Sequence, residues 1–239
     1  MQERYLGDVH DYFKFLFLKF LSINLNMKIG LNWYLVRPED IGTKEVEKND
    51  GEKRSFLNKH ELKNYDKAII KEFEKLKFRK NRNINKFTEN THLSLYVNFF
   101  NKFINLKDRK TWIEQSLNHF EKEQIIFLDP DNGFSTQNQG KKSLKYILAE
   151  DCKTYLSHNK IIIFTQFQSF RKKTSSHLDN LLRNLLDSGL KTNTPIIRNR
   201  TGPNTFYITI KPTKLKINLG SIFKKYADMI QHVELIDKV

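Results

Sequence analysis

The sequence of 239 residues contains a single cysteine, Cys152. One cysteine permits neither an intramolecular disulfide nor a cysteine-based zinc site, and it fits a reducing compartment. No segment approaches the run of about 18 apolar residues that a membrane span requires. Lys14 and Lys19 interrupt the most apolar stretch, which runs from Tyr12 to Leu21. We therefore expect a cytoplasmic protein that has no membrane partner.

Two catalytic sequence patterns are also missing. The chain has no Walker phosphate-binding loop, which argues against an ATPase or a kinase. It has no nucleophile elbow around a serine, threonine or cysteine.

Hydrophobic residues make up only 38% of the chain, but 13% of all residues are aromatic and 19 are phenylalanine. Because each ring buries a large area, we expect an ordered globular protein.

The charge of the chain is its strongest global signal. Lysine and arginine number 42 against 27 acidic residues, which gives a formal net charge of +15. Such an excess of positive charge favours binding to a polyanion, most simply DNA or RNA. The alternative is a lysine- and asparagine-rich coding bias that leaves a solvated basic surface.

Two groups of basic residues are candidates for contacts with phosphates. The first group closes a helical segment beside Phe78 and consists of Lys77, Arg79, Lys80 and Arg82. A solvated helix end, where cations suit the helix dipole, would explain these residues equally well. The second group lies near the C-terminal strands, where charges also discourage edge-to-edge aggregation. Its members are Arg171, Lys172, Arg198 and Arg200.

Hydrophobic patterning predicts that helices and strands alternate along the chain. Residues 9–21 are expected to form a helix, and residues 28–36 alternate as a strand does. Apolar runs at 124–128 and 160–165 suit strands that are buried on both faces of a parallel sheet. Further helices are expected within 57–80, 93–104, 108–120, 143–156, 175–186 and 222–230. Residues 195–200 and 205–210 are expected to form a hairpin.

This order predicts one α/β domain that spans residues 1–239. Strands that alternate with helices form a mostly parallel, Rossmann-like sheet with helices on both faces. Here a C-terminal antiparallel hairpin completes the sheet, and residues 43–122 form a helical, basic insertion. In open α/β sheets the ligand crevice lies beyond the carboxyl ends of the strands. Residues 37–42, 129–133 and 165–168 follow those ends.

The clearest candidate site follows the strand 124–128, where the chain reads Asp129-Pro-Asp-Asn-Gly133. These residue types also favour tight turns, so the motif taken alone is explained equally well by a structural turn. Its position directly after a buried strand favours a functional role.

This segment resembles the fourth motif of amino-group methyltransferases that use S-adenosylmethionine. In that family the strand ends in Asp or Asn, two prolines and an aromatic residue. The acidic or amide side chain and a proline carbonyl hold the exocyclic amine of a flipped base, and the ring stacks on that base. The resemblance implies that Asp129 and Pro130 orient the amine, with Asp131 and Asn132 beside them. Phe134 would be the stacking ring.

A second segment, Gly7–Lys14, is similar to the Gly-Asn-His-Ala-Asp-x-x-Lys segment that opens the ribosomal-RNA adenine-N6 methyltransferases of the J type. That segment helps to hold the cofactor. The cofactor-binding residues that this resemblance implies are Asp8, His10, Asp11 and Lys14. Glu39 or Asp40 could bond a ribose hydroxyl, although their loop lacks the Gly-x-Gly that lets the backbone approach a cofactor.

Two other functions stay open. Asp129 and Asp131, with Asn132, offer the hard oxygen ligands that Mg²⁺ or Mn²⁺ prefers, which would suit a metal-dependent nuclease. A non-catalytic nucleic-acid-binding protein on a decayed methyltransferase fold is the third possibility. For Asp8 and Asp11 helix capping is the alternative role, and for His10 it is a partly buried imidazole with a backbone partner.

Overall fold

The computed structural model describes residues 1–48, 54–169, 173–192 and 194–237. Its centre is a seven-stranded sheet, whose strands in spatial order are β2 (Val97–Phe100), β1 (Ile29–Asn32), β3 (Ile125–Leu128), β6 (Ile161–Phe167), β8 (Thr205–Ile210), β7 (Ile196–Asn199) and β9 (Val233–Ile236). The first four strands are parallel, and each later pairing is antiparallel. A small separate sheet pairs β4 (Gly133–Ser135) with β5 (Tyr146–Leu148).

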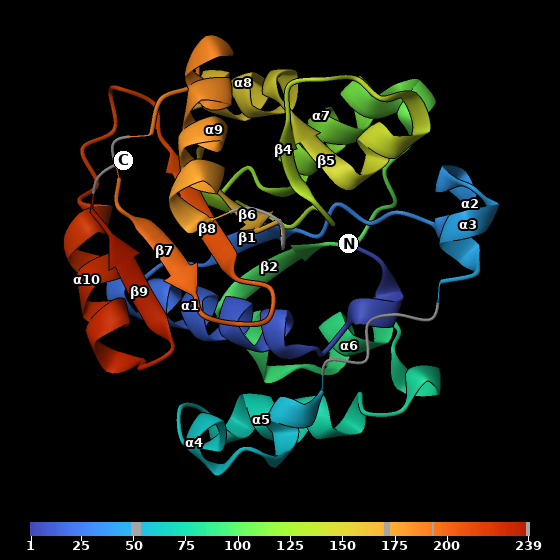
Figure 1. The fold of residues 1–239 in the computed structure, drawn as a ribbon, viewed down its shortest axis with the longest axis vertical. Helices are drawn as coiled ribbons and strands as arrows, with labels where there is room; N and C mark the ends of the chain where they lie inside the picture. The colour runs from blue at the N-terminus through green and yellow to red at the C-terminus, as the bar shows by residue number, and fades with distance from the viewer. Residues whose placement is uncertain (49–53, 170–172, 193, 238–239) are drawn as a thin grey trace.

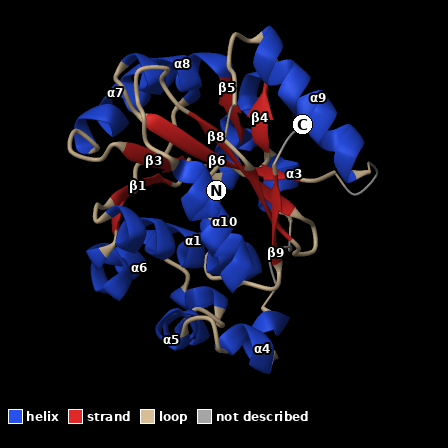
Figure 2. Cartoon of the chain, turned by 90° about the vertical axis from the view of Figure 1, so that its left-hand side faces the viewer, coloured by secondary structure: helices blue, strands red, loops and turns tan. Residues whose placement is uncertain are grey.

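Helices cover both faces of the central sheet (Figures 1 and 2). One face carries α1 (Val9–Leu25) and α10 (Leu219–Met229), and the other carries α7 (Arg109–His119), α8 (Ala149–Ser157) and α9 (Thr174–Asp187). The shorter helices are α2 (Pro38–Ile41), α3 (Thr43–Val46), α4 (His60–Lys63), α5 (Lys67–Lys75) and α6 (Ile84–Asn90). Short 3₁₀ turns occur at Glu3–Tyr5, Ser55–Asn58, Arg79–Asn81, His92–Leu95, Leu106–Asp108 and Gly140–Lys145. The mostly parallel, Rossmann-like fold with a C-terminal antiparallel hairpin is thus confirmed.

Alternate residues of the central strands supply two separate hydrophobic cores. In β3, Ile125 and Phe127 face the core that α1 and α10 cover. Ile126 and Leu128 face the core beneath α7, α8 and α9. All four side chains are fully buried, as expected for a parallel strand between two helical layers.

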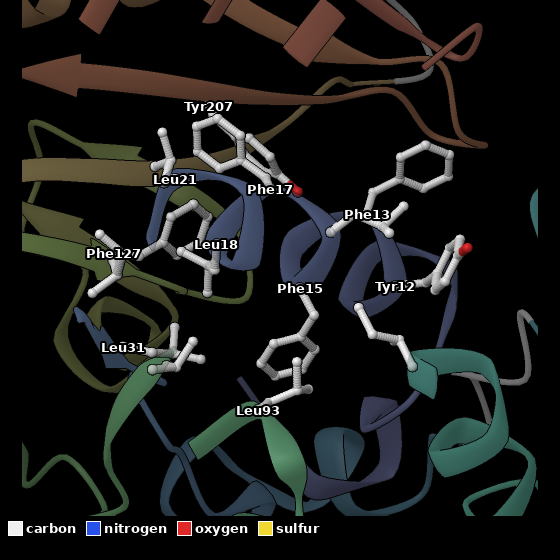
Figure 3. Close-up of a cluster of buried hydrophobic side chains, with 14 of the residues drawn as sticks. Tyr12, Phe13, Phe15, Phe17, Leu18, Leu21, Leu31, Leu93, Phe127 and Tyr207 are labelled. Carbon is white, nitrogen blue, oxygen red and sulfur yellow. The ribbon is translucent and has the colours of Figure 1, made fainter. Parts of the chain in front are cut away.

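Helix α1 is apolar on nearly every side because it is enclosed by other elements. Phe17 packs on Tyr207 of β8 and Phe223 of α10, with ring centroids 4.9 and 5.3 Å apart. On another side Phe15 contacts Phe73 of α5 at 6.0 Å. Figure 3 shows Tyr12, Phe13, Phe15 and Phe17 along the helix, with Tyr207 beside Phe17. A helix that is hydrophobic all round belongs in a core, so the N-terminal segment of the chain is anchored firmly against the sheet.

Three expected elements differ in the structure. Of residues 143–156, expected to be helical, Tyr146–Leu148 form the strand β5 because they pair with β4, and α8 begins only at Ala149. Residues 93–104, expected to be helical, form a 3₁₀ turn and the edge strand β2, in which Val97 and Phe100 are buried and pair alongside β1. Residues 43–122 therefore include a strand of the central sheet as well as helices. The strand expected at 28–36 ends at Asn32, because Tyr34 adopts a left-handed φ of 49° that breaks the extended chain.

No described helix is both long enough and apolar enough to cross a membrane.

Candidate functional site

The chain leaves two neighbouring strands, β1 and β3, in opposite directions. From β1 it passes to β2 at one edge of the sheet, whereas from β3 it passes to β6 on the other side. Ligands of open α/β sheets bind beyond the carboxyl ends of the strands at such a switch point. Asp129 is the first residue after β3, so its motif lies beside this crevice.

A pocket of about 360 Å³ opens at the strand ends. The start of α1, the loop after β3, the end of β6 and the beginning of β8 enclose it. Its volume lies within the range of about 300–1,000 Å³ that is usual for small-molecule sites. The residues singled out in the sequence that line it are Asp8, His10, Asp11 and Lys14, together with residues 129–132.

Lys14 joins the two halves of this pocket. Its Nζ lies 2.5 Å from Oδ1 of Asp11 and 2.6 Å from Oδ2 of Asp129, and the residue is only 2% exposed. The Thr165 hydroxyl donates to the other oxygen of Asp129 at 3.1 Å. The Asp129 amide donates to the Asn32 carbonyl at 2.9 Å. Asp129 is thus fixed from α1, β6 and β1 at once.

Burial controls the ionisation of the carboxyl groups at the start of α1. Desolvation raises the pKa of Asp8 to about 6, although N–H donors of Asp11 and His10 and the charge of Lys14 oppose it. Burial also raises the pKa of Asp11 to about 6, against the attraction of Lys14. For Lys14, the carboxylates of Asp11 and Asp129 outweigh burial and raise its pKa. The pocket therefore holds a buried ammonium together with two carboxyl groups, those of Asp8 and Asp11, whose pKa values are raised to about 6.

Asp8 and His10 also have local structural partners. Asp8 caps α1 by accepting from the amides of His10 and Asp11 at 2.8 and 3.0 Å. The His10 ring lies 3.3 Å from the Thr201 hydroxyl and meets the edge of Phe167 at 5.2 Å. The capping role expected for Asp8 is therefore present in a residue that also lines the pocket.

Asp131 belongs to a different cluster from Asp129. Its carboxylate lies 3.0 Å from the Met1 ammonium and 3.7 Å from Nζ of Lys145, and Gln2 donates to it at 2.7 Å. Burial opposes its ionisation, but these charges and the donor outweigh burial and lower its pKa. Among the described residues, the two aspartates of the motif therefore pair with different cations.

The described residues contain no group of three or more His, Cys, Asp or Glu side chains arranged to hold a metal ion. The ammonium of Lys14 lies between Asp11 and Asp129, where a bound cation would have to sit. This geometry gives no support to the Mg²⁺ or Mn²⁺ alternative.

Phe134 is not available as a stacking ring. Gly133 turns the chain with a φ of 104°, and the Phe134 amide donates to Oε1 of Gln166 at 2.9 Å. The Phe134 ring is 7% exposed and packs 6.3 Å from Phe164 in the core beneath α8 and α9. Phe167, at the end of β6, lines the pocket instead, as do Tyr5 and Tyr207. The rule that ligands bind beyond the carboxyl ends of strands indicated residues 165–168, although it did not single out Phe167.

Glu39 and Asp40 do not line the pocket. Both are exposed on α2. Between β1 and α2 the chain turns at Tyr34, and Tyr34 and Val36 are buried in the core beneath α7. The loop that would have brought these carboxylates to the crevice is therefore occupied by core side chains.

Arg82 is a structural residue and not an exposed phosphate ligand. It is 7% exposed, and its guanidinium donates to the carbonyls of Leu76, Arg4 and Lys77 at 3.0–3.1 Å. In contrast, Lys77 and Lys80 are exposed on either side of Phe78, which is itself 63% exposed.

The other expected phosphate contacts are distributed differently. Arg79 is exposed in the same 3₁₀ turn as Lys80. Arg198 pairs with Glu234 at 2.9 Å, and Arg200 donates to the Gln231 carbonyl. Arg171 and Lys172 lie outside the described residues. Of the described residues in these two groups, Arg79, Arg198 and Arg200 do not line the pocket.

Comparisons with protein-family models, with curated proteins and with solved structures found no match to this chain.

Proposed function

We propose that this protein modifies nucleic acid by transferring a methyl group from S-adenosylmethionine to an exocyclic amine of a base. One observation carries the proposal. Lys14 and Asp129 are 115 positions apart in the chain, and they meet in an ion pair inside one pocket. The segments 7–14 and 127–134 resemble two separate motifs of the same enzyme class, and a shared pocket is what a common site requires.

The donor set of the pocket matches the chemistry of this cofactor. The carboxyl groups of Asp8 and Asp11 suit an ammonium or ribose hydroxyls, and Lys145 suits a carboxylate. His10 and Phe167 offer rings against which adenine can pack. When bound, the cofactor supplies an electrophilic methyl group on a sulfonium sulfur.

The role of Asp129 in this proposal is to orient the amine that is modified. Its carboxylate and the Pro130 carbonyl accept hydrogen bonds from the N–H groups of the amine. Lys14 and Thr165 hold the Asp129 side chain from opposite directions, so it needs little reorganisation when the base enters. Such fixed positioning is a large source of rate enhancement in enzymes.

A non-catalytic nucleic-acid-binding protein on a diverged methyltransferase fold is the second candidate. The segment after β1, where this enzyme class approaches its cofactor with glycines, instead consists of Trp33, Tyr34, Leu35 and Val36. All four side chains are buried. The buried aromatic and aliphatic segment after β1 favours a protein that has kept a pocket for a base but does not catalyse methyl transfer.

Transfer of a labelled methyl group to DNA and RNA tests the proposal. We expect incorporation by the wild-type chain, a loss of about 100-fold in Asp129→Ala from misplacement of the amine, and partial activity in Asp129→Asn, which keeps an oxygen acceptor. Glu150→Ala, which removes an exposed carboxylate, is the control and should remain active. A wild-type chain that binds cofactor and nucleic acid but transfers nothing would support the second candidate.

A further inference from the structure

A second pocket opens beside the candidate functional site, and we call it the lysine pocket. Its volume is about 450 Å³. It shares Asn132 and Lys145 with the candidate functional site, so the two pockets adjoin. Its cationic lining comes from the segment around α3 and from the 3₁₀ turn Gly140–Lys145, and consists of Lys44, Lys48, Lys142 and Lys145.

One carboxylate organises these cations. Glu45, the only acidic residue described in the lining, lies 2.8 Å from Arg4, 2.8 Å from Lys48 and 3.0 Å from Lys145. Burial opposes its charge, but hydrogen bonds from Lys48, Gln2 and Lys145 outweigh burial and lower its pKa to about 2. Glu45 thus shares its negative charge among three cations, one of which, Lys145, also lies 3.7 Å from Asp131. The lining still carries four lysines against these two carboxylates among the described residues, so the pocket stays positive.

Lys44 and Lys142 add charge that the described part of the chain does not neutralise. Both side chains are exposed, and neither has a hydrogen-bond or ion-pair partner among the described residues. Ammonium groups on flexible stems bind phosphate as point charges. A positively lined hollow also concentrates anions in front of it.

We propose that the lysine pocket binds backbone phosphates of the nucleic acid whose base enters the candidate functional site. This inference rests on the proposed function and specifies how its substrate is held. Asn132 and Lys145 form the common wall, so a strand in the lysine pocket would present the adjacent nucleotide to Asp129. Contacts of this kind position a nucleic acid and do not read its sequence.

The position of the lysine pocket distinguishes it from the exposed cluster around Phe78. Residues of the lysine pocket lie on α3 and beside β5, whereas Lys77 and Lys80 follow α5, which packs against α1. The lysine pocket shares Asn132 and Lys145 with the candidate functional site, and the described residues around Phe78 line neither pocket. The geometry therefore assigns it the phosphates nearest to the modified base.

The test compares two double variants that remove equal charge. Lys44→Ala with Lys142→Ala alters the lysine pocket. Lys224→Ala with Lys225→Ala removes two exposed lysines of α10, on the opposite side of the molecule (Figure 1). Dissociation constants for short, mixed-sequence, single-stranded RNA and DNA are measured at several salt concentrations. The lysine-pocket variant should lower the slope of log K against log salt by roughly 0.7 for each lost contact, and the α10 variant should leave it unchanged.

Three results would overturn the inference. The first is that the wild-type chain binds neither oligonucleotide at low salt. The second is that both double variants reduce the salt slope equally. The third is that inorganic phosphate at equal concentration displaces the oligonucleotide, which would indicate a site for the free ion. Titration of S-adenosylhomocysteine into the same variants separates this inference from the proposed function. If the lysine-pocket variant reduces the salt slope but no variant and no wild-type chain binds S-adenosylhomocysteine, the phosphate-binding inference stands and the proposal of methyl transfer is rejected.

Discussion

Replacing Lys14 with methionine removes the one cation that lies between two buried carboxylates. Methionine keeps the length of the side chain but leaves Asp11 and Asp129 facing each other without compensation. Breaking one partner of a buried ion pair costs about 3–5 kcal/mol. At about 2–4 °C for each kcal/mol in a chain of this size, the midpoint of unfolding should fall by about 6–20 °C.

The loss should depend on pH in a defined direction. The pKa of Asp11 is raised from 3.8 to about 6, so the folded state keeps a proton that the unfolded chain has released between these values. Stability contributed by this group is therefore present below about pH 4 and is lost as the pH rises through about 6. Removing the positive charge of Lys14 raises the pKa of Asp11 further. The Lys14→Met variant should then lose more stability at pH 7.5 than at pH 5.

Denaturant unfolding at both pH values measures this difference, and Lys19→Met is the matched control. Lys19 lies on the same helix and pairs with Asp66 at 2.5 Å, but its side chain is 21% exposed. Solvent-exposed ion pairs contribute about 0–1 kcal/mol, and this pair is only partly shielded from solvent, so the control should lose much less than Lys14→Met at either pH. Equal losses in the two variants, or a Lys14→Met loss that does not grow with pH, would refute the reasoning.

Three further substitutions test the site and its surroundings. Arg82→Ala should destabilise the fold by at least about 2 kcal/mol, because buried carbonyls lose their donor, whereas Lys80→Ala should change the free energy of unfolding by less than about 0.5 kcal/mol; similar values would show that Arg82 is not structural. Gly133→Ala should destabilise the fold, because the added Cβ would clash with the side-chain amide of Gln166 at a positive φ; an unchanged melting midpoint would contradict this geometry. Phe167→Ala should weaken the binding of S-adenosylhomocysteine by about 0.5–1.5 kcal/mol, because its ring would pack against the adenine, and a fluorescence titration that shows no change would remove that role.

The central strands and their helices could be predicted because their patterns are local. Apolar runs such as Ile125–Leu128 identify a strand buried on both faces. Edge strands are harder to predict, since a short aromatic run suits a helix or a strand equally well. Val97–Phe100 is such a run, and only its pairing with Ile29–Asn32 makes it part of the sheet.

Part of the candidate site could be predicted because it too depends on a local pattern, the end of a buried strand. The rule that ligands bind past strand ends places Asp129 and the segment 165–168 at the crevice from the sequence alone. The place of Phe134 depended on the positive φ of Gly133, which sends the ring into the core. The lysine pocket has no sequence signature, because Glu45 and Lys145 are 100 positions apart and meet only in the fold.

The most direct test of the account is whether S-adenosylhomocysteine binds the pocket. At 100 times its dissociation constant the ligand should add about 2.7 kcal/mol of stability, which corresponds to a rise of about 5–11 °C in the melting midpoint. Asp11→Asn should weaken this effect, whereas Asp108→Asn, at an exposed carboxylate, should not. A dose-dependent rise that Asp11→Asn reduces is the result predicted here. A midpoint that does not move at any concentration would contradict the proposal that this pocket holds the methyl donor.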